Sequence, residues 1–474
     1  MELIDTWHRI TRTAVFWSFL ATALRFLGLL VVLPLLLRSV SSERMGVYYV
    51  IFSLISLVYM VDLGIAASFK RAVGYAWGGA KNLKEKGVAE TFLETSGPYW
   101  PLVADLVETM RVFFRYTAFA GFIFVGLAGG IYLLSVRPEN MSIFEIGGLW
   151  FTYLLFASFN YASNVWSVLL QSGNNVRDYQ MFFTFSLVFG YITSIGGLFL
   201  GWGLWAMCAS FAIQIVILRC CCQISCRMKN ARPLWEENGI FRKDCLGMIW
   251  PVSWRFGLAQ STGSLMMSLP VLICSSVLGL AVSASLGVTL QLATALAQIS
   301  GIGFSVKIPL FNIMRASGNI SGLRKVFETR SLWNICFYVC FGTAAFIAAP
   351  WFFKNIIKTN TDLLNGLALI LTLAFVGFES FQSMFARLLL SGNHVPYWKR
   401  SIFVGLFLAF AGYTGAVYFG LIGLLFSLLF FKLIFFDFHL MRLGLNSIDC
   451  NLSLALSRFF YSAVVFKDVF TRKR

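Results

Sequence analysis

The chain has 474 residues, of which 58% are hydrophobic and only 12% are charged, whereas about a quarter of the residues in an average soluble domain are charged. This composition excludes a water-soluble fold, and the lack of alternating segments of ~10 residues excludes a membrane β-barrel. The formal charge of +17 lies mostly between apolar runs, so membrane orientation and anionic lipid explain it better than a nucleic-acid partner does.

Apolar runs recur along the whole chain, and each can cross a hydrocarbon core of about 30 Å as a helix. The predicted spans are residues 14–37, 45–68, 113–135, 146–170, 179–200, 203–219, 256–279, 284–306, 331–352, 363–390, 401–419 and 421–441. The first run is too long for a signal-peptide core and lacks a small-residue cleavage pattern. The sequence therefore predicts an all-α integral membrane protein of about twelve transmembrane helices.

Lys and Arg are distributed unequally between the two sides of this arrangement. With the N-terminus inside, 28 of them lie in cytoplasmic segments and 5 on the other side. The positive-inside rule then predicts that both termini are cytoplasmic. The remaining basic residues lie in or at the ends of spans: Arg25, Arg115, Arg255, Arg387 and Lys432.

An internal repeat indicates how the spans are assembled. The segment 169–176 after the fourth span matches 388–395 after the tenth, at an offset of 219. Two six-helix lobes that enter from the same side are expected to be related by an axis along the membrane normal, with a cavity between them. The predicted organisation is an N-terminal lobe (1–226) with a cytoplasmic loop at 69–112, a linker (227–244), a C-terminal lobe (245–441) and a cytoplasmic amphipathic tail (442–474).

Polar side chains form helical stripes in several spans, and such side chains are costly in lipid. They either line a wet cavity or hydrogen-bond neighbouring helices. The stripes are Ser18, Thr22 and Arg25; Asn160, Asn164, Ser167 and Gln171; Gln260, Ser264 and Ser268; and Gln291, Thr294, Gln298 and Ser305.

Each ionisable residue inside a span has two specific interpretations. Arg25 is too deep to reach the interface easily, so it either lines a cavity or belongs to a buried ion pair. Glu379, two turns before Arg387, either binds a proton or Na⁺ or pairs with an arginine of another helix. Arg255 beside Trp254 either lines the cavity or anchors the interface. Three residues near the inner end of the last span are interpreted as structural: Lys432, Asp437 and His439.

No catalytic constellation is found in the sequence, and no enzyme activity, cofactor or metal site is expected. The three histidines are isolated, and a phosphate-cradling Gly-Lys-Ser/Thr loop is absent. Cys220, Cys221, Cys222 and Cys226 cannot all face one side of a helix, so they are interpreted as small apolar side chains.

Several motifs carry a resemblance to a known family. They are Arg25-Phe26-Leu27-Gly28, Met45-Gly46-Val47-Tyr48, Asp62-Leu63-Gly64 with Lys70-Arg71, Tyr75-Ala76-Trp77-Gly78-Gly79, and the Leu-x-Ser-Gly-Asn turns after the fourth and tenth spans. With them the chain resembles the polysaccharide transport family, the oligosaccharide-lipid flippases of the multidrug/oligosaccharidyl-lipid/polysaccharide exporter superfamily.

The resemblance implies two six-helix lobes in a V-shaped bundle that work by alternating access. It implies a substrate, a polyprenyl-pyrophosphate-linked oligosaccharide, that is turned across the bacterial cytoplasmic membrane for surface polysaccharide biosynthesis. Membrane lipids and a polysaccharide polymerase or export machinery are the expected partners. Arg25, Arg255 and Arg387 would hold the pyrophosphate, because guanidinium groups suit phosphates. The amides of Asn160, Asn164, Gln260, Gln291 and Gln298 would bind sugar.

Two other functions remain open. A Na⁺- or H⁺-coupled multidrug exporter of the same superfamily would favour acidic cavity residues over the arginines found here. An O-antigen polymerase or ligase would be an enzyme, typically with a large external loop, whereas the longest loops predicted here are cytoplasmic.

Overall fold

The computed structural model describes residues 14–450 apart from 61, 63, 83–97, 174, 231–233, 235–236, 317–318 and 392–394. The described residues form helices joined by turns and contain no strand. Eleven of these helices are long and apolar enough to cross a membrane, so the chain is a multi-pass integral membrane protein. The predicted all-α membrane fold is confirmed.

The chain divides into two compact units, Met1–Ser268 (unit 1) and Leu269–Arg474 (unit 2). The boundary falls inside one long helix, α11, whereas the sequence placed the join at 227–244. Parts of the predicted organisation lie outside the described residues: most of the tail (451–474), residues 83–97 of the cytoplasmic loop, and residues 174 and 392–394 of the two repeated turns.

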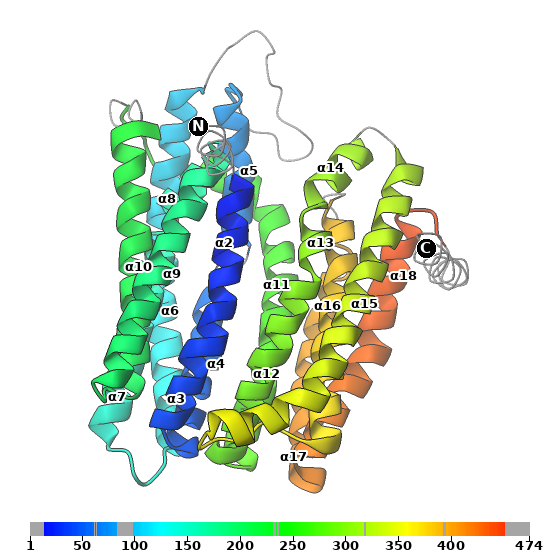
Figure 1. The fold of residues 1–474 in the computed structure, drawn as a ribbon. Helices are drawn as coiled ribbons and strands as arrows, with labels where there is room; N and C mark the ends of the chain where they lie inside the picture. Colours follow the sequence, from blue (N-terminus) through cyan, green and yellow to red (C-terminus); the bar gives the residue numbers. More distant parts are fainter. Residues whose placement is uncertain are drawn as a thin grey trace, which may run out of the picture. The chain divides into compact units, whose positions relative to one another are not determined.

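Unit 1 is a bundle in which α9 packs against both α2 and α10, and α7 packs against α6 and α10 (Figure 1). Most of the predicted spans have a helix in the expected place. The elements up to the unit boundary are α2 (Ala14–Leu27), η1 (Gly28–Val32), α3 (Leu33–Ser39), α4 (Ser42–Met60), α5 (Ile65–Trp77), α6 (Trp100–Ser135), α7 (Ile143–Ala162), α8 (Val165–Ser172), α9 (Val176–Phe199), α10 (Leu204–Ser225), η2 (Cys226–Asn230) and α11 (Lys243–Val277).

One predicted boundary in unit 1 is wrong. The second span does not continue to residue 68, because the chain turns at Gly64, which has φ +70° and lets the turn approach α11. A Cβ there would lie 2.6 Å from Phe256 and 2.9 Å from the backbone nitrogen of Gly257. The third predicted span, 113–135, lies within α6, which begins earlier, at Trp100; its 36 residues extend over about 54 Å, more than a bilayer core requires.

The first part of α6 anchors the linker that leads into α11. Asp105 accepts a hydrogen bond from the backbone N–H of Ile240 (3.0 Å) and pairs with the guanidinium of Arg242 (3.4 Å). Thr109 accepts from the backbone N–H of Arg242 (3.1 Å). This end of the linker is therefore fixed to unit 1.

Unit 2 is also built of long helices. Its elements after α11 are α12 (Leu280–Ser300), α13 (Ile302–Ser305), α14 (Ile308–Ala316), α15 (Ile320–Trp351), η4 (Phe352–Ile357), α16 (Gly366–Leu390), α17 (Trp398–Lys432), η5 (Leu433–Asp437) and α18 (Phe438–Asn446). Helix α16 packs against α12, α15, α17 and α18.

A sharp turn at Gly420 divides α17 into the last two predicted spans. Gly420 has φ +63° and ψ −149°, a conformation open essentially to glycine alone. Gly203, at the turn between α9 and α10 in unit 1, is similar, with φ +56° and ψ −126°. The repeat offset of 219 leads from Gly203 to within two residues of Gly420, so the two units turn the chain at corresponding places.

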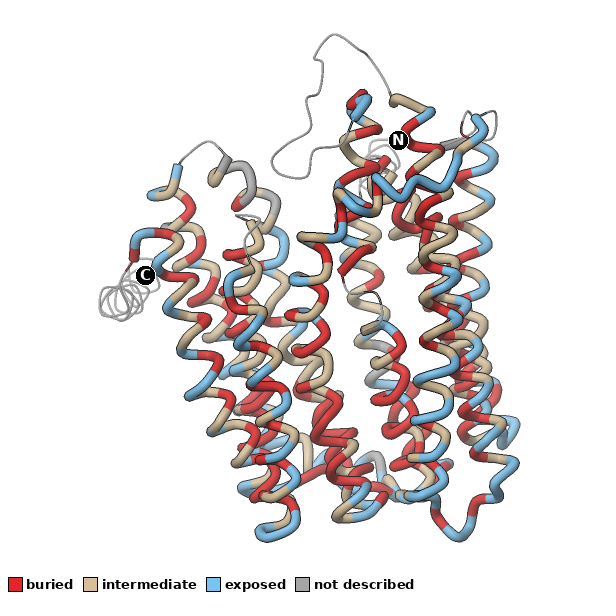
Figure 2. The backbone as a smooth tube through the Cα atoms, turned by 180° about the vertical axis from the view of Figure 1, so that it is seen from behind, coloured by how far each residue is buried: buried red, intermediate tan, exposed pale blue. Residues whose placement is uncertain are grey.

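Each unit has its own buried core of aromatic and aliphatic side chains (Figure 2). Phe69 and Phe114 are fully buried against each other in unit 1. Phe304 and Phe311 pack together in unit 2 and contact Phe327. Many large apolar side chains instead point outward, as expected where a helix faces hydrocarbon; they include Tyr116, Phe119, Phe124, Phe144 and Tyr418.

Candidate functional site

The polar stripe of the fourth predicted span lies on α7 and α8 and passes through a break in the helix. Asn164 stands at the break, where its backbone N–H bonds to the carbonyl of Tyr161 three residues back (3.1 Å). Broken helices are a common way to place polar groups inside membrane transporters. The stripe consists of Asn160, Asn164, Ser167 and Gln171, and its described hydrogen bonds run to residues of α4, α5 and α10.

Arg219 of α10 binds three of these four side chains. Its Nε donates to the Oδ1 of Asn160 (2.8 Å), and its Nη1 donates to the Oδ1 of Asn164 (3.2 Å) and to the hydroxyl of Ser167. The amide of Asn160 also donates to the hydroxyl of Tyr59 (2.9 Å). Arg219 was not among the predicted site residues, because the sixth predicted span ends at this residue and its charge was assigned to the cytoplasmic side.

The charge of Arg219 is not balanced by a carboxylate within the part of the chain that the structure describes. The residue is 7% exposed, and all its described partners are neutral. Its Nη2 group forms no hydrogen bond with the described residues. This group is not fully buried. A guanidinium with two free N–H donors and an uncompensated charge is suited to an anion.

Arg25 is connected to Arg219 through two aromatic side chains of α9. Its guanidinium lies over the ring of Phe183, 4.9 Å from the centroid. Phe183 stacks on Tyr179 at 6.4 Å, and Tyr179 interacts electrostatically with both Arg25 and Arg219. Since Arg25 is exposed in the unit, its charge is accessible. Its neighbours on the predicted stripe, Ser18 and Thr22, bond to the backbone of their own helix.

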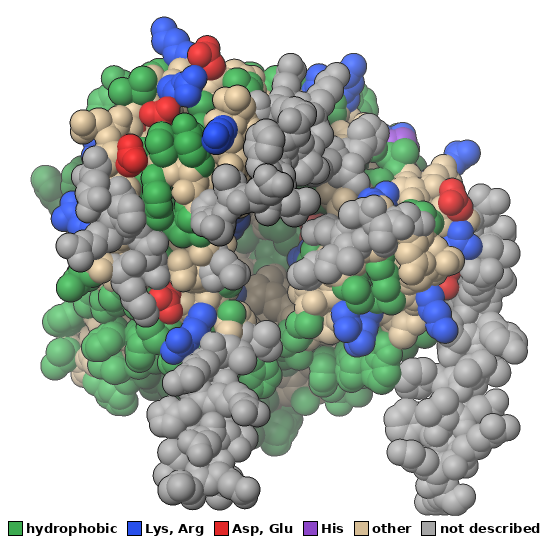
Figure 3. Space-filling model, turned by 90° about the horizontal axis from the view of Figure 1, so that it is seen from above, with side chains coloured by type: hydrophobic (Ala, Val, Ile, Leu, Met, Phe, Trp, Pro, Cys, Tyr) green, Lys and Arg blue, Asp and Glu red, His purple; other side chains and the backbone are tan. Residues whose placement is uncertain are grey.

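The stripe continues to Lys70 near the end of unit 1 where α2 begins. The Nζ of Lys70 donates to the Oε1 of Gln171 (2.8 Å). Burial lowers the pKa of Lys70 from its ordinary value. Lys and Arg side chains also stand on this end of the molecule, beside a smaller number of Asp and Glu (Figure 3).

The remaining predicted residues of unit 1 lie on α11 and do not join this cluster. Arg255 is exposed, with its guanidinium over the ring of its neighbour Trp254 (5.5 Å). Gln260 is exposed as well. Neither makes a hydrogen bond to the α7–α10 network among the described residues.

Unit 2 holds a second charged cluster, around Lys432. The Nζ of Lys432 lies 3.0 Å from Glu379 of α16 and 3.1 Å from each carboxylate oxygen of Asp437. Side-chain exposures are 1% for Lys432, 8% for Asp437 and 20% for Glu379. Glu379 thus pairs with a lysine, where the sequence had considered an arginine.

The two clusters occupy corresponding helices. Glu379 takes the place of Asn160 under the repeat offset, and each contacts a basic residue from a later helix of its own unit, α10 or α17. In unit 1 this is Arg219 with neutral partners, whereas in unit 2 it is Lys432 with two carboxylates. The sites therefore carry opposite net charges.

The other predicted residues of unit 2 are dispersed. The Nη1 of Arg387 donates to the hydroxyl of Ser305 (2.9 Å) and makes no ion pair with the described residues. Gln291 and Gln298 lie on α12, and Gln298 is exposed.

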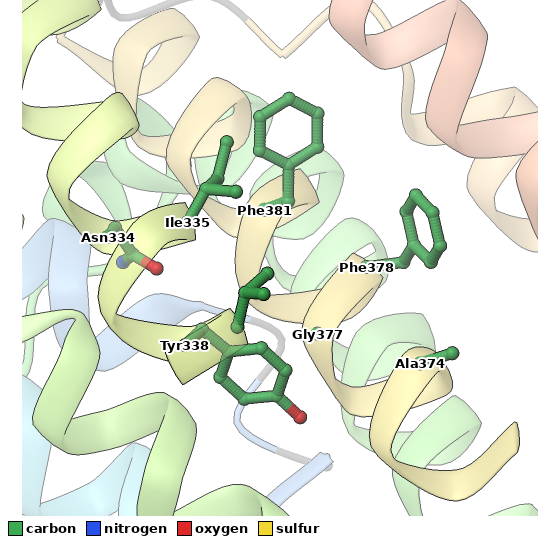
Figure 4. A pocket seen from close by; sticks show the side chains of 8 residues that line it. Asn334, Ile335, Tyr338, Ala374, Gly377, Phe378 and Phe381 are labelled. Carbon is green, nitrogen blue, oxygen red and sulfur yellow. The ribbon is translucent and has the colours of Figure 1, made fainter. Parts of the chain in front are cut away.

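A separate groove of ≈ 270 Å³ lies between α15 and α16 (Figure 4). Its lining is apolar apart from Asn334 and Tyr338, and the Tyr338 hydroxyl already donates to the carbonyl of Leu373 (2.7 Å). The groove therefore offers little to a sugar or a phosphate. Its lining residues are Asn334, Ile335, Tyr338, Val339, Ala374, Gly377, Phe378 and Phe381.

Comparison with known proteins identifies the fold. No protein-family model matches the sequence, and no curated protein is significantly similar to it. The structure is similar to an inward-facing MATE family multidrug resistance transporter of the MOP superfamily, with 14% identity, 90% of this chain and 98% of that chain covered, and a TM-score of 0.62. It is also similar to the lipid II flippase MurJ in an inward closed conformation (12% identity, 97% and 99% covered, TM-score 0.63).

A MOP superfamily transporter from Pyrococcus furiosus, described as having a binding pocket of reversed polarity, matches as well (13% identity, 93% and 96% covered, TM-score 0.55). The chain therefore has the fold of MOP superfamily transporters. This fold agrees with the superfamily indicated by the sequence motifs.

Proposed function

We propose that the chain is a flippase that moves a polyprenyl-pyrophosphate-linked oligosaccharide across the bacterial cytoplasmic membrane by alternating access, and that it is not an enzyme. The fold supports a transporter, and one of the solved structures that share it is a lipid II flippase. The observation that carries the choice of an anionic substrate is the charge of Arg219, which has no carboxylate partner among the described residues.

The pyrophosphate would be held by Arg25 and Arg219. Arg25 is exposed over Phe183, and Arg219 keeps one amino group free, so both can donate to phosphate oxygens. Arg255 and Arg387 remain proposed secondary contacts, since Arg387 still has donors beyond its bond to Ser305. The proposed sugar contacts are the amides of Asn160, Asn164, Gln260, Gln291 and Gln298.

A cation-coupled multidrug exporter is the second candidate, because MATE transporters share the fold. The acidic cluster at Glu379 would favour a cationic substrate, but Lys432 already lies against both carboxylates. The exposed Arg25 and the buried Arg219, which has no carboxylate partner among the described residues, would repel a cationic drug. The charges therefore favour the flippase.

Replacement of Arg25 tests the proposal. Arg25→Ala should leave the protein at its normal level in the membrane but abolish flipping, so that lipid-linked oligosaccharide accumulates on the inner leaflet. Arg25→Lys should restore only part of the activity, because an ammonium lacks the planar pair of donors that matches phosphate. The measurement is mass spectrometry of lipid-linked sugars in a deletion strain that carries each variant.

Ser18→Ala is the matched control, because the described partner of the Ser18 hydroxyl is the carbonyl of Ala14 in the same helix (2.9 Å). It should cost much less than Arg25→Ala. If the Arg25→Ala protein is less abundant and its surviving molecules transport normally, Arg25 is structural and the site is wrong. A deletion strain without accumulated lipid-linked sugar would overturn the function itself.

A further inference from the structure

The charged cluster of unit 2 contains one more negative charge than positive charge when all its groups are ionised. Glu379 and Asp437 contribute two carboxylates, and Lys432 contributes one ammonium group. The cluster lies among buried apolar side chains, with the Phe375 ring 5.9 Å from Lys432 Nζ. An unbalanced charge in such surroundings is costly unless a cation is taken up.

A metal cation does not fit the centre of this cluster, because the ammonium group already occupies it. Lys432 Nζ lies within 3.1 Å of three carboxylate oxygens, so it takes the position that Na⁺ would need between them. A proton needs no such space. The arrangement therefore selects a proton over Na⁺ as the cation that neutralises it.

Glu379 is the carboxylate that can take this proton. Both oxygens of Asp437 accept hydrogen bonds from Lys432, whereas the buried Oε2 of Glu379 has only the ion-pair contact and no aligned hydrogen bond. Glu379 is also the most exposed of the three. It thus combines an unsatisfied buried oxygen with access to the outside of the cluster.

Other charged groups on the helices around α16 have described partners outside the cluster; Arg315 of α14, for example, donates to the carbonyl of Leu388 and to the hydroxyl of Ser447. Helix α12, which packs against α16, has no charged residue. Arg387 of α16 bonds to Ser305, and Arg400 of α17 donates to the carbonyl of Phe435 (2.6 Å). On α18, His439 interacts electrostatically with Arg400 and Arg442. Helix α15 carries its charges in its first turns: Arg324, Lys325, Glu328 and Arg330.

We propose that Glu379, Lys432 and Asp437 form a proton-binding site that excludes Na⁺ because the lysine fills the cation position. One proton is shared by the two carboxylates and enters through Glu379. The consequence for the proposed function is that protons, and not Na⁺, are the coupling ion. Only this consequence rests on the proposed function. Proton binding itself can be tested without a substrate.

The experiment measures the thermal midpoint of the purified full-length protein in detergent at mildly acidic and mildly alkaline pH, with NaCl or KCl at equal ionic strength. A folded state that binds an extra proton loses stability as the pH rises, so the wild-type midpoint should fall toward alkaline pH. Glu379→Gln mimics the protonated carboxyl. It should lose this pH dependence and be at least as stable as the wild type at alkaline pH.

Sodium provides the second arm. NaCl should not stabilise the wild type relative to KCl, whereas Lys432→Ala opens the cation position and should gain a Na⁺-dependent rise in its midpoint. Glu145→Gln, which removes an ion pair with Arg44 at a distance from the cluster, is the control and should keep the wild-type pH dependence. Stabilisation of the wild type by Na⁺, or an unchanged pH dependence in Glu379→Gln, would overturn the proposal. If Lys432→Ala does not fold, the comparison of the wild type with Glu379→Gln still decides.

Discussion

At the scale of single residues, unit 1 stabilises a buried cation without neutralising it. Arg219 replaces its water shell with the oxygens of Asn160, Asn164 and Ser167, but none of these carries a charge. Burying an uncompensated charge costs several kcal/mol, and apolar replacements of buried ionic groups are often neutral or stabilising. A residue kept for packing alone would not need this charge, so Arg219 is better explained by a ligand.

This argument predicts that Arg219→Met separates stability from transport. The thermal midpoint should change little, because relief of the cost of burying the charge offsets the loss of three hydrogen bonds to neutral groups, while flipping should fall about tenfold or more, as expected for the loss of a hydrogen bond to a charged group. The measurements are thermal unfolding of the purified variant and accumulation of lipid-linked oligosaccharide in cells. Arg44→Met, which removes a partly exposed pair with Glu145, should leave flipping unchanged. A marked fall in the midpoint of Arg219→Met would assign the residue to structure.

At the scale of helices, hydropathy predicted nearly every span, because a bilayer fixes the minimum length of an apolar helix. It could not predict the break at Asn164, since no glycine or proline marks it. The extent of α10 was misjudged in a way that the sequence could have corrected. The apolar cysteines after Arg219 continue the helix to Ser225, so the arginine lies inside the span. Contacts such as Glu379 with Lys432 join residues far apart in the chain, and a single sequence does not reveal them.

The turn at Gly420 provides a test at this scale. Gly420→Ala places a Cβ in a backbone conformation that costs about 1–3 kcal/mol for other residues, although the space around it is open. The variant should therefore unfold at a lower temperature. Gly247→Ala is the matched control, because Gly247 is also free of neighbours but has no positive φ and lies in the first turns of α11, where alanine favours the helix. Equal midpoints for the two variants would show that the turn is not strained by a side chain.

At the scale of the whole molecule, the two units share an order of helices and a glycine turn but differ in the charge of their polar clusters. Unit 1 presents uncompensated arginines, and unit 2 holds an excess of carboxylate. A transporter that moves an anionic substrate and is driven by a cation needs both kinds of site. Two units with a similar arrangement of helices can supply them through different residues at matching places, such as Asn160 in one unit and Glu379 in the other.

The orientation in the membrane is the property on which the direction of flipping depends, and it remains a prediction from charge. When Arg219 is counted as part of α10 and not of the cytoplasmic linker, 27 basic residues lie on the predicted inner side and 5 on the other. This asymmetry still decides the orientation under the positive-inside rule. Both termini and the basic end of unit 1 that carries Lys70 should therefore face the cytoplasm.

Reporter fusions test this orientation at junctions that the helices define. Fusions after Val136, Gly201 and Leu280 should report the outside. These residues follow α6, lie between α9 and α10, and begin α12, and the distribution of Lys and Arg assigns all three junctions to the outer side. Fusions after Lys81, Lys229 and Arg474 should report the cytoplasm; Arg474 lies outside the described residues. We expect alkaline phosphatase to be active when it is fused at the first three sites. We expect a cytoplasmic fluorescent reporter to be fluorescent at the last three. A cytoplasmic signal at Gly201 would contradict the twelve-span arrangement, because α9 and α10 could not then both cross the membrane.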